Sequence, residues 1–434
     1  MKNLICILLI AVMMLGLASC QGSEPENRTL ATEGAEETEG VTESDISSEA
    51  GHETTAETAT QANTESETAS ETETDTEIET ETETEEEDDM ISPADGEKIV
   101  LANDEVYGWW SSYNYGKTDS NPFYRHEDIY YPKALTFTWK EVEGAAYYKL
   151  YLSTSEAFEA DKTESYLVNT NSITLKHLFT GTKYYWKVDA AKLGEDNAEI
   201  KEAAVELRSF RTADSPRCLE IEGVSNTRDI GGIAAAKGYR IKQGMIYRGG
   251  KLNDMTEAGK EFFLNYVGVK TDLDLRTPGE GGAGSGSPLG SDINYVNING
   301  RYYTGGMGIS SEEGKSVFAQ EIRLFANKDN YPIYIHCSLG RDRTGTLAFV
   351  LEALLGVNKN MLIMDYELSV FSVTGTLDNA GVAAIKNNIL ATYDYINGFE
   401  GKTFADKTEN YLLSIGITAE EIQTIRDLLL EEVN

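Results

Sequence analysis

The 434-residue chain is short of basic residues, cysteine and long apolar runs, and each shortage excludes a class of protein. Lysine and arginine total 37 against 73 aspartate and glutamate, a net charge of −36, so the basic surface of a nucleic-acid-binding protein is missing. Four cysteines are too few for a small fold held together by disulfides. No stretch after residue 20 is apolar enough to cross a bilayer. We therefore predict no nucleic-acid partner and no later membrane span.

Residues 1–20 have the form of a secretory signal, because Lys2 precedes an apolar core that ends in small residues. The sequence Leu17-Ala18-Ser19-Cys20 is similar to a bacterial lipobox, in which the cysteine is lipidated and becomes the mature N-terminus. The alternative is an ordinary signal with an incidental cysteine. Acyl chains contribute about 0.8 kcal/mol per buried methylene. The lipobox therefore predicts an extracytoplasmic, membrane-anchored lipoprotein at the bacterial cell surface.

Residues 21–90 carry 25 acidic side chains, one arginine and no aromatic residue, a net charge of −24. Such a segment cannot bury enough apolar surface to offset chain entropy, so we predict a disordered acidic Thr/Glu-rich linker. Self-repulsion should extend it beyond the roughly 45–50 Å of a neutral coil. It is either a stalk that raises the folded part above the membrane or a solvated tail. The anchor before it and the folded body after it favour the stalk.

Short segments of residues 91–215 alternate apolar and polar side chains, the period-2 pattern of half-buried strands. These segments are residues 135–139, 148–152, 173–175 and 184–188. Turn-like residues separate them, which favours an antiparallel β-sandwich. Leu178–Val188 resembles the E–F corner of a fibronectin type III domain, and Ser209–Pro216 resembles its last strand and exit. The resemblance implies an all-β fibronectin type III-like sandwich.

The aromatic-rich residues 95–130 fit that pattern less well. One interpretation is an elaborated first strand. Trp109 and Trp110 belong either to a carbohydrate-binding face or, by the simpler interpretation, to core or spacer packing. We find no catalytic constellation before residue 216.

The chemistry lies in residues 216–434. Tyr331–Ile335 is predicted as a short buried strand and Thr346–Leu355 as an apolar helix, with HCSLGRDRTG (His336–Gly345) between them. The order strand, tight loop, helix gathers backbone N–H groups and a helix N-terminus around one point, which is an anion site suited to phosphate. Cys337 there should be a thiolate nucleophile of lowered pKa. Arg343 is placed to hold two phosphoryl oxygens bidentately.

Other loop residues have predicted supporting roles. Thr344 can donate a hydrogen bond to the thiolate, and His336 should orient the loop backbone rather than act as a base. The residues expected to bind the substrate are Ser338, Leu339, Gly340, Arg341 and Thr344.

Cys-x5-Arg-Thr is the signature of cysteine-dependent phosphatases, and HCSLGRDRTG resembles the HCxxGKDRTG loop of the atypical bacterial tyrosine phosphatases. Similar family segments are NTRDIGG at 226–232, YRGGKL at 247–252, TDLDLR at 271–276 and DYELS at 365–369. The chain departs from the pattern at Arg341, where lysine is usual, and at Thr227, where an aromatic is usual. The resemblance implies a secreted dual-specificity enzyme that acts on phosphotyrosine, phosphoserine or phosphothreonine, and phosphoinositide through a cysteinyl-phosphate intermediate.

The catalytic domain should be α/β, with a mostly parallel central sheet and helices on both faces. Strands are predicted near 270–275, 294–298 and 333–336, and helices near 257–266, 315–325 and 418–432. The last helix begins with the capping box Thr418-x-x-Glu421.

The general acid has two candidates. Residues 293–328 contain no aspartate, whereas Asp342 lies beside Arg343 in the loop and can protonate the leaving oxygen. The family resemblance supports Asp342 as well. Asp274, at the C-terminal end of a predicted strand, is the second candidate unless it pairs with Arg276 or Arg248. Arg228 and Asp229 are expected to brace the site.

Three function classes follow. The first is the cell-surface phosphatase, whose substrate is a phosphorylated protein, a phosphoinositide or a small phosphate ester. The second is a cysteine phytase-like enzyme acting on inositol or sugar phosphates. The third is a non-catalytic surface binding protein, which the intact Cys337, Asp342 and Arg343 disfavour. No cofactor and no metal are expected.

Overall fold

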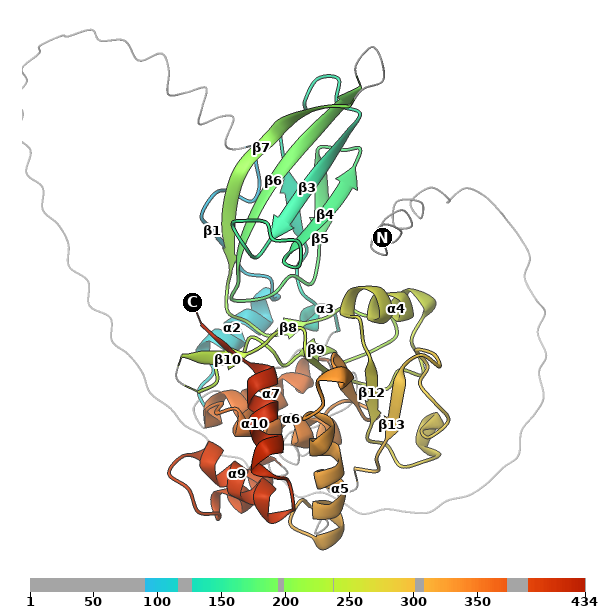
Figure 1. Cartoon of the computed structure of the whole chain (residues 1–434), viewed down its shortest axis with the longest axis vertical. Coiled ribbons are helices and arrows are strands. Elements are labelled where there is room, and N and C mark those ends of the chain that lie inside the picture. The colour runs from blue at the N-terminus through green and yellow to red at the C-terminus, as the bar shows by residue number, and fades with distance from the viewer. Residues whose placement is uncertain are drawn as a thin grey trace, which may run out of the picture. The chain divides into compact units, whose positions relative to one another are not determined.

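The computed structural model describes residues 90–115, 127–193, 199–236, 238–300, 308–372 and 389–433 (Figure 1). These residues belong to one compact unit. The predicted signal, Cys20 and almost all of the acidic linker lie outside the described residues. Within the described part of the chain, no helix combines the length and the apolar character that a membrane crossing requires.

The first part of the described chain forms two β-sheets around an aromatic core (Figure 1). One sheet has the order β1-β7-β6-β3-β4, and a second pairs β2 with β5. The strands are β1 (Glu97–Ile99), β2 (Leu135–Thr138), β3 (Tyr147–Ser153), β4 (Thr163–Val168), β5 (Ser172–Leu175), β6 (Lys183–Leu193) and β7 (Glu199–Thr212). Phe137 of β2 meets Trp186 of β6 at a ring-centroid distance of 5.2 Å, so the two sheets pack face to face. The fibronectin type III likeness stays a prediction.

Among the described residues of 95–130, the strand β1 is short and two helices follow it, so the predicted elaborated first strand is not found there. The helices are α2 (Asp104–Ser112) and α3 (Glu127–Tyr130). Asn103 caps α2 by accepting a hydrogen bond from the backbone N–H of Glu105. Trp109 packs edge-on against Phe371 of α7 (Lys359–Ser372) at 5.2 Å. Trp109 therefore takes part in packing between elements, which agrees with the simpler interpretation.

The catalytic body is built on a six-stranded sheet of order β13-β12-β14-β11-β9-β8. Its strands are β8 (Arg217–Cys218), β9 (Arg228–Asp229), β11 (Ile246–Gly249), β12 (Thr271–Asp274), β13 (Asn294–Asn297) and β14 (Ile333–His336). The neighbours from β13 to β11 pair in parallel, and β9 and β8 extend the sheet antiparallel. The predicted α/β fold with a mostly parallel sheet is confirmed.

Helices cover both faces of this sheet. Successive side chains of β14 point to opposite faces and enter two different cores. Ile333 and Ile335 enter the core shared with the C-terminal helices, whereas Tyr334 packs in the core beside Phe263. The helices of the first face are α5 (Glu312–Leu324), α6 (Asp342–Leu354), α7, α9 (Phe404–Ser414) and α10 (Ala419–Leu429). The second face is covered by α4 (Glu257–Glu261) and the π-helical segment η1 (Phe262–Val267).

The C-terminal helix confirms one prediction and corrects another. Thr418 and Glu421 form the reciprocal capping box at the start of α10. The helix ends at Leu429 instead of 432, because Leu430–Glu432 form β15, which pairs antiparallel with β10 (Tyr239–Ile241). Backbone pairing there replaces the last helical turn that the apolar periodicity predicted.

Candidate active site

The phosphate-binding loop predicted from the sequence connects β14 to α6. The strand ends at His336, and the helix begins at Asp342, so five residues make the turn. Gly340 has a φ of +69°, and a Cβ atom there would lie 2.2 Å from the backbone of Gly249 on β11. Only glycine fits this close approach. The loop is therefore tied to the sheet on one side and to the N-terminus of α6 on the other.

Cys337 is buried at the start of this loop. Burial acts to raise the pKa of its thiol, but Arg343, the hydroxyl and N–H of Thr344 and the N–H of Leu339 lower the pKa below its ordinary value. The buried Thr344 hydroxyl has no hydrogen-bond partner of standard geometry among the described residues, which leaves it available to the sulfur. The surroundings thus favour a thiolate nucleophile at position 337.

Arg343 faces a carboxylate that the sequence analysis did not identify. Its two terminal nitrogens lie 2.8 and 2.7 Å from the Glu280 oxygens, and the Ser338 hydroxyl donates to the same carboxylate at 2.5 Å. These contacts, led by that with Arg343, lower the pKa of Glu280 to about 2. Glu280 is therefore ionised, and it fixes Arg343 and Ser338 rather than supplying a proton.

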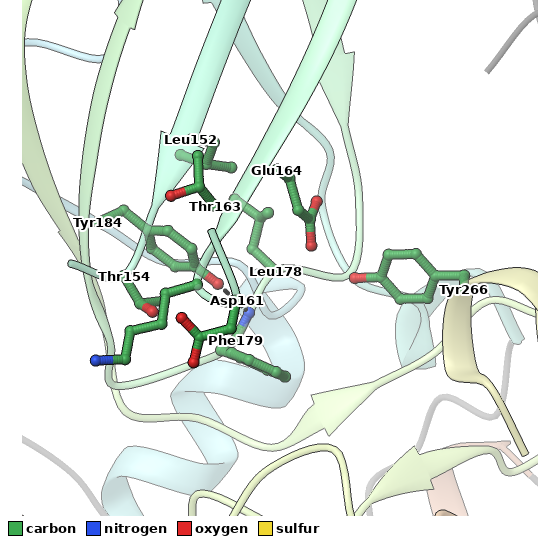
Figure 2. A pocket seen from close by; sticks show the side chains of 10 residues that line it. Leu152, Thr154, Asp161, Thr163, Glu164, Leu178, Phe179, Tyr184 and Tyr266 are labelled. Carbon is green, nitrogen blue, oxygen red and sulfur yellow. Dashed lines mark hydrogen bonds between the residues drawn. The ribbon is translucent and has the colours of Figure 1, made fainter. Parts of the chain in front are cut away.

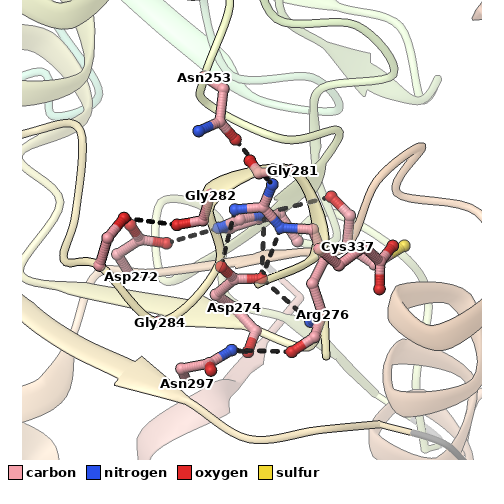
Figure 3. A network of polar contacts seen from close by, with 12 residues as sticks. Asn253, Asp272, Asp274, Arg276, Gly281, Gly282, Gly284, Asn297 and Cys337 are labelled. Atoms are coloured by element: carbon pink, nitrogen blue, oxygen red, sulfur yellow. Dashed lines mark hydrogen bonds and ion pairs between the residues drawn. The ribbon is translucent and has the colours of Figure 1, made fainter. Parts of the chain in front are cut away.

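The loop that carries Glu280 is held by Arg276 (Figure 3). Arg276 donates to Asp274 at 2.9 and 2.8 Å on one side, and to Asn253 at 2.7 Å and the Gly281 carbonyl at 3.1 Å on the other. Gly281 itself has a φ of +55°, which an L side chain rarely adopts. Asp274 and Arg276 thus fix the position of the loop that carries Glu280.

Asp274 is poorly suited to donate a proton. It is fully buried, and besides Arg276 it accepts a hydrogen bond from Tyr295 at 2.9 Å. Burial acts to raise its pKa, but the hydrogen bonds from Arg276 and the nearby His336 lower the pKa below the ordinary value. The pairing with Arg276 that the sequence left open is the arrangement found.

Asp342 lies at the first turn of α6, half-buried beside the phosphate-binding loop. The Tyr366 hydroxyl donates to one of its oxygens at 3.1 Å, and Arg341 contacts both oxygens at 3.3 and 3.1 Å. Tyr366 comes from α7, within the DYELS segment. These contacts orient Asp342 without burying it, as a proton donor to a bound ester requires.

His336 is buried behind the loop. Its Nε2 lies 2.9 Å from Asp272, and its Nδ1 lies 3.2 Å from the Cys337 carbonyl oxygen. Burial acts to lower its pKa, but Asp272 outweighs this and raises the pKa above the ordinary value. The contacts agree with the predicted role of orienting the backbone.

Two further side chains hold loop carbonyls. Arg248 donates to the Gly340 carbonyl at 2.9 Å, and Asn226 donates to the Leu339 carbonyl at 2.9 Å. Arg228 joins them, since it donates to Asn226 at 2.7 Å and shares Asp365 with Arg248. Arg228 and Arg248 therefore hold the loop through its Leu339 and Gly340 carbonyl groups.

Asp229 and Cys218 lie away from the site. Asp229 pairs with Arg217 at 2.7 Å, and Arg217 in turn donates to the His177 carbonyl in the sandwich at 2.8 Å, so Asp229 braces the junction of the two bodies. Cys218 lies on β8, three strands from β14, or roughly 14 Å at strand spacing. A disulfide needs Cα atoms within about 7 Å, so Cys218 does not pair with Cys337.

A cavity of about 410 Å³ lies elsewhere, at the end of the sandwich (Figure 2). Phe179 and Tyr184 line it, and Tyr266 of η1 points its hydroxyl toward it. None of its lining residues belongs to the phosphate-binding loop.

The comparisons with known proteins point the same way. Residues 219–431 match the model of the tyrosine phosphatase family. A protein from Cupriavidus necator, named provisionally as a tyrosine-protein phosphatase, is 28% identical over 171 residues, which cover 34% of this chain and 61% of that protein. A tyrosine-protein phosphatase from Nostoc commune is 27% identical over 230 residues, which cover 44% of this chain and 76% of its own.

Among solved structures, the core catalytic domain of the PP-IP phosphatase Siw14 from S. cerevisiae, in complex with citrate, is similar at 20% identity. The match covers 35% of this chain and 88% of that one, with a TM-score of 0.23. This likeness is too slight to carry an argument about substrate.

The fold and the loop of residues 216–434 have the features of a cysteine-dependent phosphatase. The family match over residues 219–431 and the two relatives support a phosphatase hydrolase domain in this part of the chain, similar to the tyrosine phosphatase family.

Glu280 is the residue that sequence reasoning missed. Glu280 lies outside residues 293–328, the stretch considered above for a general acid. It follows β12 in a glycine-rich stretch. Its signal was positional, because loops at the carboxyl ends of parallel strands converge on the site in α/β folds.

Proposed function

We propose that this enzyme hydrolyses phosphotyrosine, with phosphoserine, phosphothreonine and phosphoinositide as further substrates, through a phosphate ester bound in the loop around Cys337. The observation that carries the proposal is the convergence of a low-pKa thiol, the backbone N–H groups of Leu339 and Thr344 that face it, and the buried Arg343. This combination matches the trigonal-bipyramidal phosphoryl group, whose equatorial oxygens need several directed donors.

The reaction would run in two displacements. The Cys337 thiolate attacks phosphorus, the bond to the ester oxygen breaks, and Asp342 donates its proton to that oxygen as the alcohol or phenol leaves. Water then attacks the cysteinyl phosphate and gives a proton to Asp342, so that the sulfur–phosphorus bond breaks and inorganic phosphate departs. Arg343 would hold the equatorial oxygens through both steps. No metal is required by this scheme.

The test of the nucleophile is Cys337→Ser in the full chain. Hydrolysis of p-nitrophenyl phosphate should fall below a few per cent of the wild-type rate, because the hydroxyl is not ionised at neutral pH. Binding of inorganic phosphate to the variant, measured by calorimetry, should persist. Activity retained above a few per cent would mean that another residue attacks.

A second candidate is an inositol- or sugar-phosphate phosphatase of the cysteine phytase type. The N–H and guanidinium groups of the loop donate hydrogen bonds to any phosphate ester. With the half-buried Arg341 beside them, they suit a polyanionic headgroup as well as a phosphopeptide. A panel of phosphotyrosine peptide, phosphoinositide and phytate, assayed side by side, distinguishes the two. A kcat/KM for phytate above that for the peptide would favour the second candidate.

We further propose that the enzyme acts at the bacterial cell surface, lipidated at Cys20, with the acidic linker as a stalk and the β-sheets as a fibronectin type III-like spacer. The lipobox and the linker composition support this location. Cys20→Ser should release the protein from membranes or leave it unprocessed in a fractionation experiment, while deletion of residues 30–88 should keep it membrane-bound and active. A Cys20→Ser protein that stays anchored would contradict the lipobox.

A further inference from the structure

Helices α2 and α3 lie between the first two strands of the sandwich in the chain, yet they pack on the catalytic body. Val106 of α2 and Tyr130 of α3 share a buried core with Leu368 and Phe371 of α7. This segment precedes residue 219, where the match to the tyrosine phosphatase family begins. The catalytic body thus uses side chains from outside the family domain.

One of these side chains reaches the network behind the phosphate-binding loop. The Tyr130 hydroxyl is buried and accepts a hydrogen bond from Arg228 at 3.2 Å. Arg228 also donates to Asn226 at 2.7 Å and to Asp365 at 2.7 Å. Through Arg228, Tyr130 is therefore linked to Asn226 and to Asp365, where two branches of the network begin.

The two branches end on neighbouring carbonyl groups of the loop. Asn226 donates to the Leu339 carbonyl, and Asp365 binds Arg248, which donates to the Gly340 carbonyl. Fixing a carbonyl fixes the peptide plane, and hence the direction of the N–H group on its other side. Those N–H groups are the ones expected to face the phosphoryl oxygens.

We propose that Tyr130 is a positioning residue for phosphate binding, acting through Arg228 on the loop carbonyls of Leu339 and Gly340. The inference rests on the proposed phosphate site around Cys337. An arginine in a dry interior needs its N–H groups satisfied, and Tyr130 satisfies one that no residue of the family domain takes at this point. The enzyme therefore depends on a segment that is separated from its catalytic domain in the chain by strands β2 to β7.

The test is Tyr130→Phe in the full chain, which removes the hydroxyl and keeps the ring. The matched control is Tyr113→Phe. Tyr113 comes from the same segment, and its hydroxyl donates to Glu367 of α7 at 2.8 Å. That bond is not among those that hold the Leu339 and Gly340 carbonyls, which come from Asn226 and Arg248. Each variant loses one hydroxyl and its hydrogen bond, with Arg228 of β9 for Tyr130 and with Glu367 of α7 for Tyr113, so both should lower the midpoint of thermal unfolding by a similar amount.

The readout is competitive inhibition by inorganic phosphate, together with the pH dependence of Cys337 alkylation by iodoacetamide. For Tyr130→Phe we expect an inhibition constant raised about threefold to tenfold and a thiolate that forms at higher pH. Tyr113→Phe should leave both unchanged. Equal losses in the two variants, or a Tyr130→Phe enzyme with wild-type phosphate inhibition, would overturn the proposal. An active Cys337→Ser enzyme would instead overturn the phosphate site itself.

Discussion

The sandwich and the catalytic body bury different kinds of side chain. Among the described residues from β2 to β7, the core is aromatic and aliphatic, and no aspartate, glutamate, lysine or arginine is buried. The catalytic body buries charges around the phosphate-binding loop, namely Arg228, Arg248, Asp272, Asp274, Arg276, Arg343 and Asp365. Taking a charge out of water costs several kcal/mol, and pairing with an opposite charge often recovers only part of this. The catalytic body therefore gives up stability to hold the loop, whereas the sandwich does not.

The sharpest way to test that difference is to neutralise Asp342, the carboxylate left half-exposed. General acid catalysis is typically worth about 10²–10⁴-fold, and it matters most for a poor leaving group. Asp342→Asn should therefore slow alkyl phosphates by about that factor, affect p-nitrophenyl phosphate far less, and remove the basic limb of the pH–rate profile for the former.

Asp274→Asn provides the comparison, because Asp274 is buried and paired with Arg276. It should slow both substrates alike, through displacement of the Glu280 loop. If Asp274→Asn shows the leaving-group dependence and Asp342→Asn does not, Asp274 is the general acid.

The next prediction concerns the sandwich alone. Phe137 is fully buried between Trp186 and Phe210, with ring-centroid distances of 5.2 and 5.8 Å. Phe137→Ala should lower the free energy of unfolding by about 3–5 kcal/mol, seen as an earlier transition in urea. Below that transition kcat should equal the wild-type value. Leu167→Ala, at an exposed site on β4, is the control and should change neither. A fall in kcat for Phe137→Ala would show that the packing of the sandwich influences catalysis.

The same contrast explains how far the sequence could predict the structure. Alternation of apolar side chains located most strands of the sandwich, since burial on one face imposes a period of two. The phosphate-binding loop was predicted because its nucleophile, arginine and glycine lie within seven residues of chain. Both signals are local.

The missed features depend on contacts between distant segments. Glu280 meets Arg343 across 63 residues, and Tyr130 meets Arg228 across 98. Nothing in the composition around Glu280 or Tyr130 distinguishes them from surface residues. Helices α2 and α3 were likewise missed, because their apolar side chains face α7 rather than a core of their own.

A smaller effect is expected at Glu280, which fixes Arg343 from outside the loop. Glu280→Gln keeps the size of the side chain but loses the charge that holds the guanidinium. We expect kcat/KM for p-nitrophenyl phosphate to fall about tenfold, because a charge-assisted hydrogen bond contributes about 1.5–3 kcal/mol. Since the pKa of Glu280 is lowered to about 2, the wild-type ion pair should persist at pH 5. Glu313→Gln, at an exposed position on α5, should leave the rate unchanged. A Glu280→Gln enzyme with wild-type kcat/KM would show that Arg343 is held without it.

The smallest expected effect is a pair of opposite pH dependences at two buried histidines. In the catalytic body Asp272 raises the pKa of His336, against the effect of burial. In the sandwich, burial and then Arg217 lower the pKa of His177 to about 3. The unfolded value is about 6.5 for both.

The two signs follow from proton linkage. The protonated His336 stabilises the folded state below about pH 6.5, and this contribution is lost as the pH rises through its higher folded pKa. The neutral His177 contributes stability above about pH 6.5, which is lost as the pH falls toward 3. His336→Gln should therefore flatten the decline in unfolding free energy as the pH rises above about 6.5, and His177→Gln should flatten the decline as the pH falls below that value. Urea unfolding at a series of pH values measures both. If His336→Gln instead steepens the alkaline decline, its carboxylate partner does not hold a proton on the ring, and the buried charge behind the loop is smaller than the contacts indicate.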